Sequence, residues 1–260
     1  MTGNSEVVVY ANPGLLAAAA AARLVTRLVD VQAAKGSASL VLTGGSTGIA
    51  VLEQLRRSPA RDAVDWSRLD LYWGDERFVP AGDGERNEKQ AREALLDHVP
   101  VDPNRVHAMA ASDGEFGDDP DAAAEAYARV LAENAQPEDH GDVPGFDIML
   151  LGLGGEGHTA SVFPESPAVY ETERPVVAVR NCPKPPPTRV SLTLPAIRRA
   201  HDVWLMTTGE AKADAVALAL AGAGEVQVPV AGARGRRRTL WLIDRLAAAK
   251  LSHVYLPPIA

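Results

Sequence analysis

The sequence is poor in cysteine, with Cys182 as the single thiol in 260 residues. One thiol cannot form a disulfide within the chain or a cysteine-based zinc site, and we expect it to be an inert loop residue rather than a nucleophile. Long hydrophobic runs are also missing: no stretch of about 18 consecutive apolar residues occurs, so no membrane span is expected. The opening stretch MTGNSEVVVYANP lacks a basic segment and a small-residue cleavage site, which predicts no secretory signal and a cytoplasmic location.

Positive charge is the second shortage, because 26 Lys and Arg stand against 34 Asp and Glu, for a formal net charge of −8. Binding to a nucleic-acid backbone needs a basic surface, so no nucleic-acid partner is expected. The one dense basic run is RGRRR, from Arg234 to Arg238. It is short, lacks interleaved aromatic residues and leads into an apolar segment, so we interpret it as a solvated loop to which the sequence assigns no partner.

Short apolar or β-branched segments alternate along the chain with longer helical segments. This alternation predicts an α/β fold whose mostly parallel central sheet is covered by helices. The chain is long enough for one domain with a sizeable core, residues 1–260. Residues 146–154, FDIMLLGLG, are nearly all apolar, which is typical of a strand buried on both faces at the centre of such a sheet.

Caps and periodicity place the individual elements. The first helix is expected at residues 14–34, with Asn12 as its N-cap, Pro13 in its first turn and Gly36 at its end. The proline-rich segment 180–189 is expected to be a surface loop, because proline disrupts both helices and strand pairing. Other helices are expected at 49–57, 88–96, 121–134 and 210–221, and strands at 6–10, 39–43, 68–75 and 146–154 and within PVVAV, RVSLTL, HDVWLMTTG and TLWLID.

The segment LVLTGGSTG reads as a strand, a glycine turn and the start of a helix. Gly44 and Gly45 would let backbone N–H groups approach an anion, the helix N-terminus adds partial positive charge, and Ser46 supplies a hydroxyl. This geometry suits a phosphate. The segment lacks the lysine of a P-loop and the glycine spacing of a dinucleotide site, so nucleotide binding is not favoured. An ordinary tight turn is the alternative.

The segment YWGDERFVP brings Asp75, Glu76 and Arg77 to the end of another expected strand. Ligands of parallel α/β sheets bind outside the carboxyl ends of the strands. Arg77 could there stabilise an oxyanion, and Asp75 could orient it or a sugar hydroxyl. The alternative is an internal Asp–Arg pair that closes the loop.

The segment LLGLGGEGHTASVFPES presents Glu156 and His158 among four glycines after the expected central strand. Histidine titrates near neutrality, so His158 could remove a proton from water, and Glu156 could orient the imidazole. A single histidine is more often structural, but its place at a strand end favours function. The other histidines show no metal-type spacing, so no metal is expected; they are His98, His107, His140, His201 and His253.

Two basic residues in the C-terminal half of the chain are further candidates for ligand contact. Arg189 comes directly after the proline-rich loop, and Lys212 lies in the first turn of an expected helix. A helix dipole favours an acidic residue at that position, so the placement of Lys212 indicates ligand contact rather than helix stabilisation. A solvated surface lysine is the alternative.

Five motifs occur in order over nearly the whole chain: LTGGSTG, YWGDERFVP, FDIMLLGLGGEGHTASVFPES, PPPTRVSLTLPAI and TTGEAKADAV. Together they resemble the 6-phosphogluconolactonases, within the glucosamine-6-phosphate isomerase-like superfamily. The resemblance implies a Rossmann-like three-layer α/β/α fold and hydrolysis of 6-phospho-D-glucono-1,5-lactone to 6-phosphogluconate in the oxidative branch of the pentose phosphate pathway. It implies a small sugar-phosphate lactone as partner and no cofactor, and a monomer or weak homo-oligomer is expected.

The resemblance also implies roles for individual residues. His158 matches the general base for the attacking water, Arg77 matches the basic residue near the lactone, and Asp75 matches an acidic pocket position of open role. The residues that match the phosphate-binding positions are Gly44, Gly45, Ser46, Arg189 and Lys212.

Two positions depart from the family pattern. This chain has Glu156 where the family commonly has Asp, so contact between that carboxylate and His158 stays open. It has Arg86 before Asn87 where the family often has Ser, and we expect Arg86 to add local positive charge.

Two other functions remain as alternatives. Glucosamine-6-phosphate deaminase or isomerase activity occurs on the same fold, but those relatives look like Asp-Glu-Tyr at residues 75–77 and carry an acidic residue at the position of Phe163. A non-catalytic sugar-phosphate sensor is the second alternative, and it would need an added helix-turn-helix segment for which this chain leaves little length.

Overall fold

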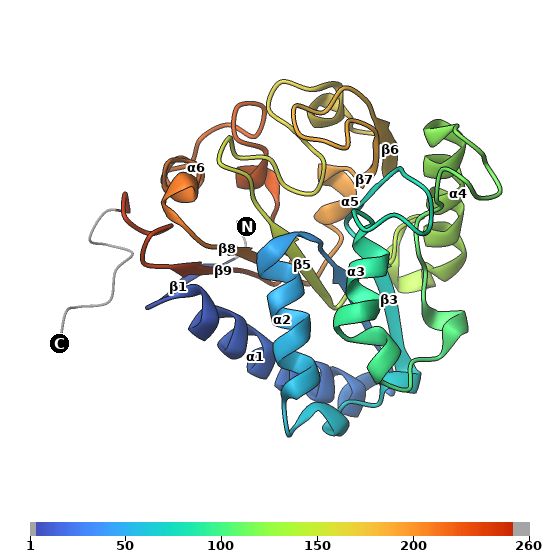
Figure 1. The fold of residues 1–260 in the computed structure, drawn as a ribbon, viewed down its shortest axis with the longest axis horizontal. Coiled ribbons are helices and arrows are strands. Elements are labelled where there is room, and N and C mark those ends of the chain that lie inside the picture. The colour runs from blue at the N-terminus through green and yellow to red at the C-terminus, as the bar shows by residue number, and fades with distance from the viewer. Residues whose placement is uncertain (1–3, 252–260) are drawn as a thin grey trace.

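The structure is a computed structural model that describes residues 4–251; His253 and the first three residues of the opening stretch lie outside that range. Among the described residues, six strands form a sheet in the order β1-β9-β8-β5-β2-β3, and its neighbouring strands are parallel (Figure 1). The predicted parallel sheet is therefore confirmed. Its strands are β1 (Asn4–Tyr10), β2 (Ala38–Leu42), β3 (Leu69–Trp73), β5 (Ile148–Gly152), β8 (Asp202–Thr207) and β9 (Arg238–Asp244).

Three strands form a second, antiparallel sheet in the order β4-β7-β6, which the sequence did not reveal. The strand expected at 68–75 is confirmed as β3, but it ends at Trp73, and Asp75 already belongs to β4 of the other sheet. Gly74 joins the two sheets: its N–H donates to the Leu42 carbonyl at 3.0 Å, and its carbonyl accepts from the Leu192 N–H at 2.9 Å. The strands are β4 (Asp75–Arg77), β6 (Val176–Val179) and β7 (Arg189–Leu192).

Helix α1 (Pro13–Lys35) begins and ends where its caps predicted. The Asn12 side chain accepts the N–H of Leu15 at 2.9 Å, and Gly36 ends the helix with a left-handed φ of 83°. Its buried side chains recur at helical spacing, which gives the helix one apolar face. Those residues are Leu16, Ala17, Ala20, Ala21, Leu24, Val25, Leu28 and Val31.

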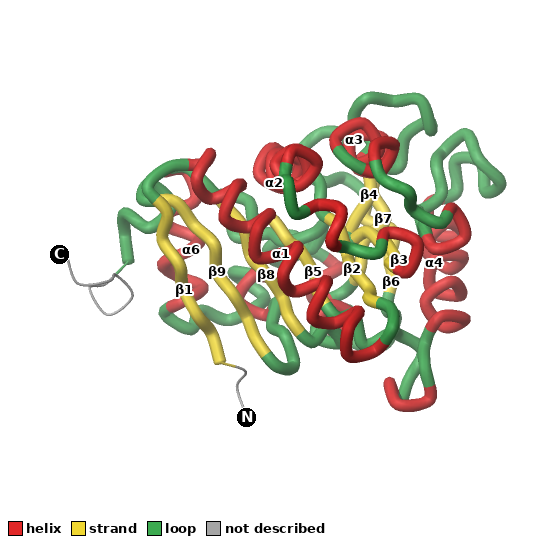
Figure 2. The backbone as a smooth tube through the Cα atoms, turned by 90° about the horizontal axis from the view of Figure 1, so that it is seen from below, coloured by secondary structure: helices red, strands yellow, loops and turns green. Residues whose placement is uncertain are grey.

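Helices lie on both faces of the six-stranded sheet. Figure 2 shows α1 across one face and α6 (Ala213–Leu220) behind the strands, while α4 (Pro120–Asn134) packs against the small sheet. The result is the Rossmann-like three-layer α/β/α fold. Among the described residues, no helix is long and apolar enough to cross a membrane. Further helices are α2 (Gly45–Arg57), α3 (Asn87–Ala94) and α5 (Leu194–Ile197).

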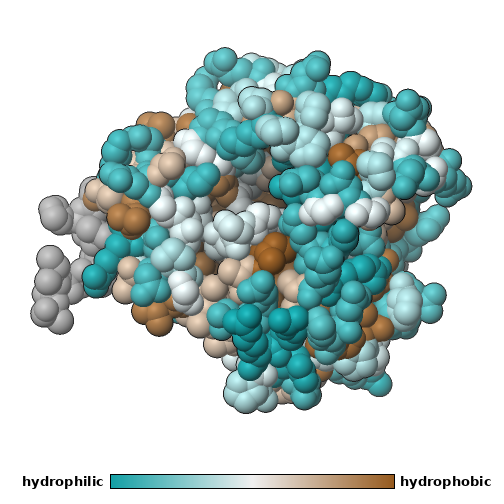
Figure 3. Space-filling model, in the orientation of Figure 1, coloured by the Kyte–Doolittle hydropathy of each residue, from teal (hydrophilic) through white to brown (hydrophobic). Residues whose placement is uncertain are grey.

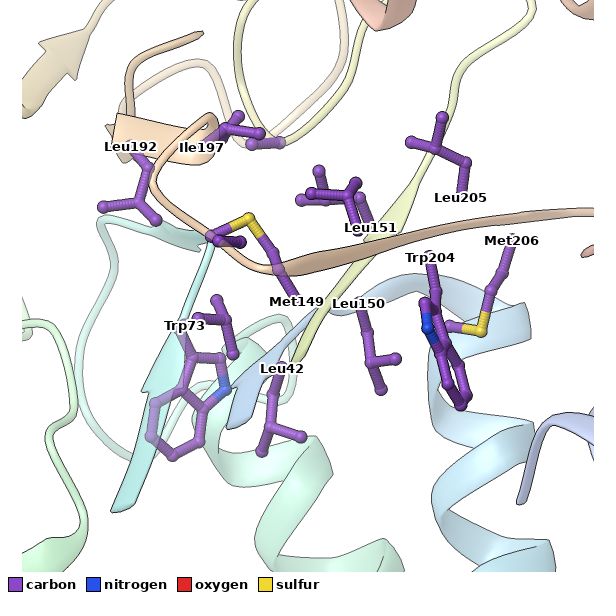
Figure 4. Packing of buried hydrophobic residues seen from close by; sticks show 14 of the residues in the cluster. Leu42, Trp73, Met149, Leu150, Leu151, Leu192, Ile197, Trp204, Leu205 and Met206 are labelled. Carbon is purple, nitrogen blue, oxygen red and sulfur yellow. The ribbon is translucent and has the colours of Figure 1, made fainter. Parts of the chain in front are cut away.

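Strand β5 is buried on both faces, as its apolar sequence predicted. The adjacent residues Leu150 and Leu151 point to opposite faces and are 1% and 0% exposed. In Figure 4, Leu150 lies on the side of Leu42 and Trp204, and Leu151 lies on the side of Leu205. Burying each leucine side chain contributes about 1.5–3 kcal/mol, so packing on two faces holds the end of β5 rigidly among its neighbours.

Candidate active site

A cavity of about 210 Å³ lies at the carboxyl ends of β2, β5 and β8, beside the small sheet. Figure 3 shows this face of the molecule hollowed near its centre, between hydrophilic residues. Glu156 is the one predicted site residue that does not line the cavity, but it contacts His158. The predicted residues that line it are Gly44, Gly45, Ser46, Asp75, Arg77, His158, Arg189 and Lys212.

The glycine turn forms the helix N-terminus that the sequence suggested. Helix α2 starts at Gly45, four residues before the expected start at Ile49, so Ser46 lies in its first turn. Gly45 has φ +80°, a conformation that favours glycine. No side chain caps the helix and its first turn holds no acidic residue, so its N–H groups and partial positive charge remain available to an anion.

Asn87 closes the glycine turn from the opposite side, a role that the sequence did not reveal. Its Nδ2 donates to the Asp75 carbonyl at 2.8 Å, and its Oδ1 lies so near Gly44 that a Cβ there would approach it to 1.8 Å. Within residues 4–251 this buried Oδ1 has no hydrogen-bond partner. Asn87 is therefore held by β4 and packs so closely on the glycine turn that position 44 requires glycine.

The small sheet places two arginines side by side on the cavity wall. Arg77 and Arg189 are directly opposite in the antiparallel β4–β7 pair, so both side chains lie on one face. Asp75 shares that face and is buried, with its Oδ2 2.7 Å from the Ser161 hydroxyl and 3.9 Å from Arg189 Nη1. Directly opposed like charges are unfavourable, so this wall favours an anionic group in the cavity.

The two guanidinium groups differ in the donors that they leave unused. Arg189 Nε donates to the Pro186 carbonyl at 3.1 Å and its Nη2 to the carbonyls of Lys184 and Pro185, so most of the group holds the proline-rich loop. Arg77 Nη1 donates to the Glu85 carbonyl at 2.6 Å, while its buried Nε has no partner in the described part of the chain. Arg77 thus has more N–H donors free to bind a ligand than Arg189 has.

Arg86 does not add positive charge to the cavity, which corrects the sequence-based expectation. It is 1% exposed and absent from the lining, with its Nη2 3.1 Å from Glu88 and 3.7 Å from Glu76. Burial raises the pKa of Glu76 to about 7, although Arg86 and backbone hydrogen bonds oppose the rise. Glu76 accepts hydrogen bonds from the backbone N–H groups of Arg77 and Asn87, each at 2.7 Å. The buried Arg86–Glu76 pair therefore fixes the backbone of two residues that line the cavity.

The contact between His158 and Glu156 is present: Nδ1 and Oε1 are 2.8 Å apart. The pair packs over Gly154, where a Cβ would lie 2.1 Å from Nδ1. The imidazole also packs against the ring of Phe163, with the ring centroids 4.4 Å apart and the planes tilted by 30°. If Nδ1 donates to the carboxylate, Nε2 is the nitrogen free to accept a proton in the cavity. Burial lowers the pKa of His158, with Glu156 opposing, so the neutral imidazole prevails at pH 7.

Lys184 is a further charged residue near the site that sequence reasoning missed. Its Nζ lies 2.9 Å from Glu156 Oε2. Burial alone would raise the pKa of Glu156, but hydrogen bonds from Lys184, the backbone and His158 outweigh it and lower that pKa to about 2. The position of Lys184 in KPPP, within an irregular loop, gave no periodic signal.

Lys212 lines the cavity, but not from within a helix. It ends a 3-10 turn (Glu210–Lys212) directly before α6, where the sequence predicted one helix over 210–221. No hydrogen bond or ion pair involves its ammonium within residues 4–251. Partial burial lowers the pKa of Lys212, and the positive charge of Lys184 lowers it further. An unpaired, partly buried ammonium at a cavity wall is available to an anion.

Hydroxyl side chains at the strand ends complete the lining. Thr43 directly follows β2, and Thr207 and Thr208 stand at the end of β8. Their positions after strands were the signal that could have found them. No group of three or more His, Cys, Asp or Glu side chains in the described part of the chain could hold a metal ion.

Comparison with known proteins identifies the family. The family model described as glucosamine-6-phosphate isomerases/6-phosphogluconolactonase matches residues 11–241. The chain belongs to this family. A 6-phosphogluconolactonase of Streptomyces coelicolor is 61% identical over 258 residues, which cover 99% of each chain.

Solved structures of this family share the fold. The structure of 6-phosphogluconolactonase from Trypanosoma brucei matches with a TM-score of 0.84 at 30% identity, covering 96% of this chain and 100% of that one. A monomeric glucosamine-6-phosphate deaminase matches with a TM-score of 0.75 at 21% identity, over 94% of this chain and 99% of that one. The fold alone therefore does not separate a lactonase from a deaminase.

Proposed function

We propose that this protein hydrolyses 6-phospho-D-glucono-1,5-lactone to 6-phospho-D-gluconate, the second step of the oxidative branch of the pentose phosphate pathway. The proposal rests chiefly on His158, which contacts Glu156 at 2.8 Å in a cavity that is also lined by an uncapped helix N-terminus and three cationic side chains. The high identity to 6-phosphogluconolactonases supports it. We expect a cytoplasmic enzyme that acts as a monomer or weak homo-oligomer.

The phosphate binds at the end of the cavity formed by the α2 N-terminus and Lys212. Gly44, Gly45 and Ser46 supply N–H and hydroxyl donors, and Lys212 supplies a full charge. Arg189 adds positive charge from the wall, and its Nη1, 3.5 Å from the Ser161 hydroxyl, has a second N–H with which to donate to the phosphate. Because the phosphate is remote from the reacting bond, its binding energy serves to orient the lactone carbonyl near His158.

His158 Nε2 removes a proton from water as the water oxygen bonds to C1 of the lactone. The carbonyl becomes a tetrahedral oxyanion, which the Arg77 guanidinium stabilises. The intermediate collapses, the bond between C1 and the ring oxygen breaks, and the imidazolium returns its proton to that oxygen. Asp75 holds Ser161 and faces Arg189, and so fixes the charged wall beside the reaction.

A coupled assay on freshly generated lactone tests the activity, with spontaneous hydrolysis subtracted. We expect catalysed production of 6-phosphogluconate well above that background. A rate indistinguishable from the background would refute the proposal. Binding of 6-phosphogluconate without any turnover would support the non-catalytic sensor instead.

Deaminase activity is the nearest alternative, and two positions argue against it. The deaminase-like relatives look like Asp-Glu-Tyr at residues 75–77, so Arg77 stands at the position of their tyrosine. Phe163 stands where they carry an acidic residue. Phe163 is 3% exposed and packs on His158, so no carboxylate occupies that position. We expect no ammonia release from glucosamine 6-phosphate.

Replacing Lys212 with alanine is expected to raise KM for the lactone by about tenfold to a hundredfold, with little change in kcat. A charge-assisted hydrogen bond of about 1.5–3 kcal/mol is lost from a group remote from the reacting bond. Steady-state kinetics measure the effect. Lys250→Ala, which removes an exposed lysine paired with Asp214, is the matched control. An unchanged KM in the Lys212 variant would remove this residue from the phosphate site.

Replacing Gly44 with alanine is expected to weaken substrate binding and to destabilise the fold by about 1–3 kcal/mol, the usual cost of overpacking. The new Cβ would overlap Asn87 Oδ1, whose side chain is held by the Asp75 carbonyl. KM and chemical unfolding report the two effects. Gly82→Ala is the control, because a Cβ at Gly82 meets no atom within 4 Å. Wild-type KM and stability in Gly44→Ala would contradict the close approach.

A further inference from the structure

The carboxylate of Glu156 is shared between two basic groups. Oε1 lies 2.8 Å from His158 Nδ1, and Oε2 lies 2.9 Å from Lys184 Nζ. Glu156 and Lys184 are partly exposed, at 33% and 44%, whereas the His158 side chain is 15% exposed. The contacts therefore run from the partly exposed Lys184 through Glu156 to His158 at the cavity, and Lys184 has no role in the reaction described above.

An anchored loop brings Lys184 to this position. Arg189 Nη2 donates to the carbonyl of Lys184 itself at 3.1 Å, and Arg189 Nε donates to the carbonyl of Pro186 at 3.1 Å. The Cys182 N–H donates to the Pro187 carbonyl at 2.9 Å and closes the loop. Consecutive prolines restrict the backbone between these anchors. Lys184 thus extends from a fixed backbone, unlike an ordinary surface lysine.

The charges around His158 act in opposite directions. Burial has the largest effect and favours the neutral ring; Glu156 and Asp75 favour the imidazolium, and Lys184 favours the neutral ring. The remaining charged groups of the cavity wall are the cations Arg77, Arg189 and Lys212. An oriented carboxylate at 2.8 Å would by itself favour a protonated ring that cannot act as a base. A second cation on the same carboxylate reduces this pull while leaving the orienting contact in place.

We propose that Lys184 is a positioning residue that holds the Glu156 carboxylate and keeps the His158 imidazole unprotonated at neutral pH. The catalytic consequence rests on the proposed function, in which His158 is the base. The electrostatic coupling does not, because the protonation of His158 can be measured without substrate. Lys184 would thereby separate the two effects of Glu156, orienting the ring and raising its proton affinity.

NMR titration of the histidine ring protons tests the coupling directly. The His158 signal is assigned by its loss in His158→Gln. In Lys184→Met we expect the pKa of His158 to rise by about one unit, the lower end of the range for a nearby charge, because the pair is partly exposed. Lys184→Arg should keep the wild-type pKa, since it keeps the charge. Lys250→Met, which removes another carboxylate-paired lysine, should also leave it unchanged.

The pH dependence of lactone hydrolysis gives the catalytic readout. In Lys184→Met the acidic limb of kcat/KM is expected to move to higher pH by the same amount, since more imidazole is protonated at a given pH; well above both pKa values the rate should return to that of the wild type. An unchanged His158 titration in Lys184→Met would overturn the inference and leave the proposed function standing. A shifted titration in a protein without lactonase activity would uphold the coupling and refute the function.

Discussion

Replacing His158 with alanine is expected to lower kcat by about 10²–10⁴, the range for the loss of a general base. The imidazole lies on the cavity wall, and because burial lowers its pKa it is neutral near pH 7 and can accept a proton. KM should change little, since the proposed phosphate site lies at the other end of the cavity. Steady-state kinetics after subtraction of spontaneous hydrolysis measure the loss.

Controls separate the chemical role of His158 from its packing against Phe163. His158→Asn keeps a polar side chain of similar reach, and it should lose kcat to the same extent, because an amide is not a base at this pH. Thermal unfolding of both variants reports any loss of packing. His98→Ala removes an exposed histidine and should retain full activity. Turnover near the wild-type value in either His158 variant would exclude it as the base.

Glu156 contributes to this result through geometry that the sequence left open. The side chain of Glu156 is longer than that of the Asp that the family commonly has. It still makes the contact with Nδ1 of His158, because the turn places both residues over Gly154. The close approach to Gly154 leaves no space for a Cβ there. The longer side chain is therefore accommodated by a glycine turn, and the carboxylate–imidazole contact is kept.

Periodicity and caps predicted the large sheet and its helices because those elements are determined locally. The run 146–154 had to be a strand buried on both faces, and Asn12 and Gly36 set the ends of α1 through contacts a few residues away. The small sheet escaped prediction because its pairing is not local. Strand β4 has three residues, and its partner β7 begins more than 100 residues later. No periodic pattern can be read from such a short strand.

The same distinction holds for the site. His158 and the glycine turn follow the parallel strands β5 and β2, whose carboxyl ends converge, so their meeting was predictable. Arg77 was predicted beside them because it lies a few residues beyond β3, although it reaches the cavity from β4 of the small sheet. Arg86 was placed wrongly because its burial depends on Glu76 and Glu88, whose contacts cannot be seen in the sequence. Lys184 was missed because an irregular loop brings it to Glu156 from 28 residues away. Burial and loop closure thus determine which charged groups lie near His158.

Replacing Arg77 with alanine is expected to lower kcat by about 10²–10³, the cost of removing one oxyanion donor, with a smaller effect on KM. Its Nη1 is fixed by the Glu85 carbonyl, so the group is preorganised, and its buried Nε has no partner within residues 4–251. Arg77→Lys should restore little, because a flexible ammonium cannot make the Glu85 contact and face the carbonyl at once. Arg57→Ala, at an exposed arginine of α2, is the control.

The ratio of the two kinetic effects decides which end of the substrate Arg77 meets. Arg77 and Arg189 face each other across β4 and β7, so an anion between them could be either the phosphate or the developing oxyanion. Loss of an interaction made only in the transition state lowers kcat and kcat/KM equally, whereas loss of phosphate binding raises KM alone. Added guanidinium should restore part of the kcat of Arg77→Ala by occupying the vacated donor position. A raised KM with normal kcat would move Arg77 to the phosphate end and leave the oxyanion to another donor.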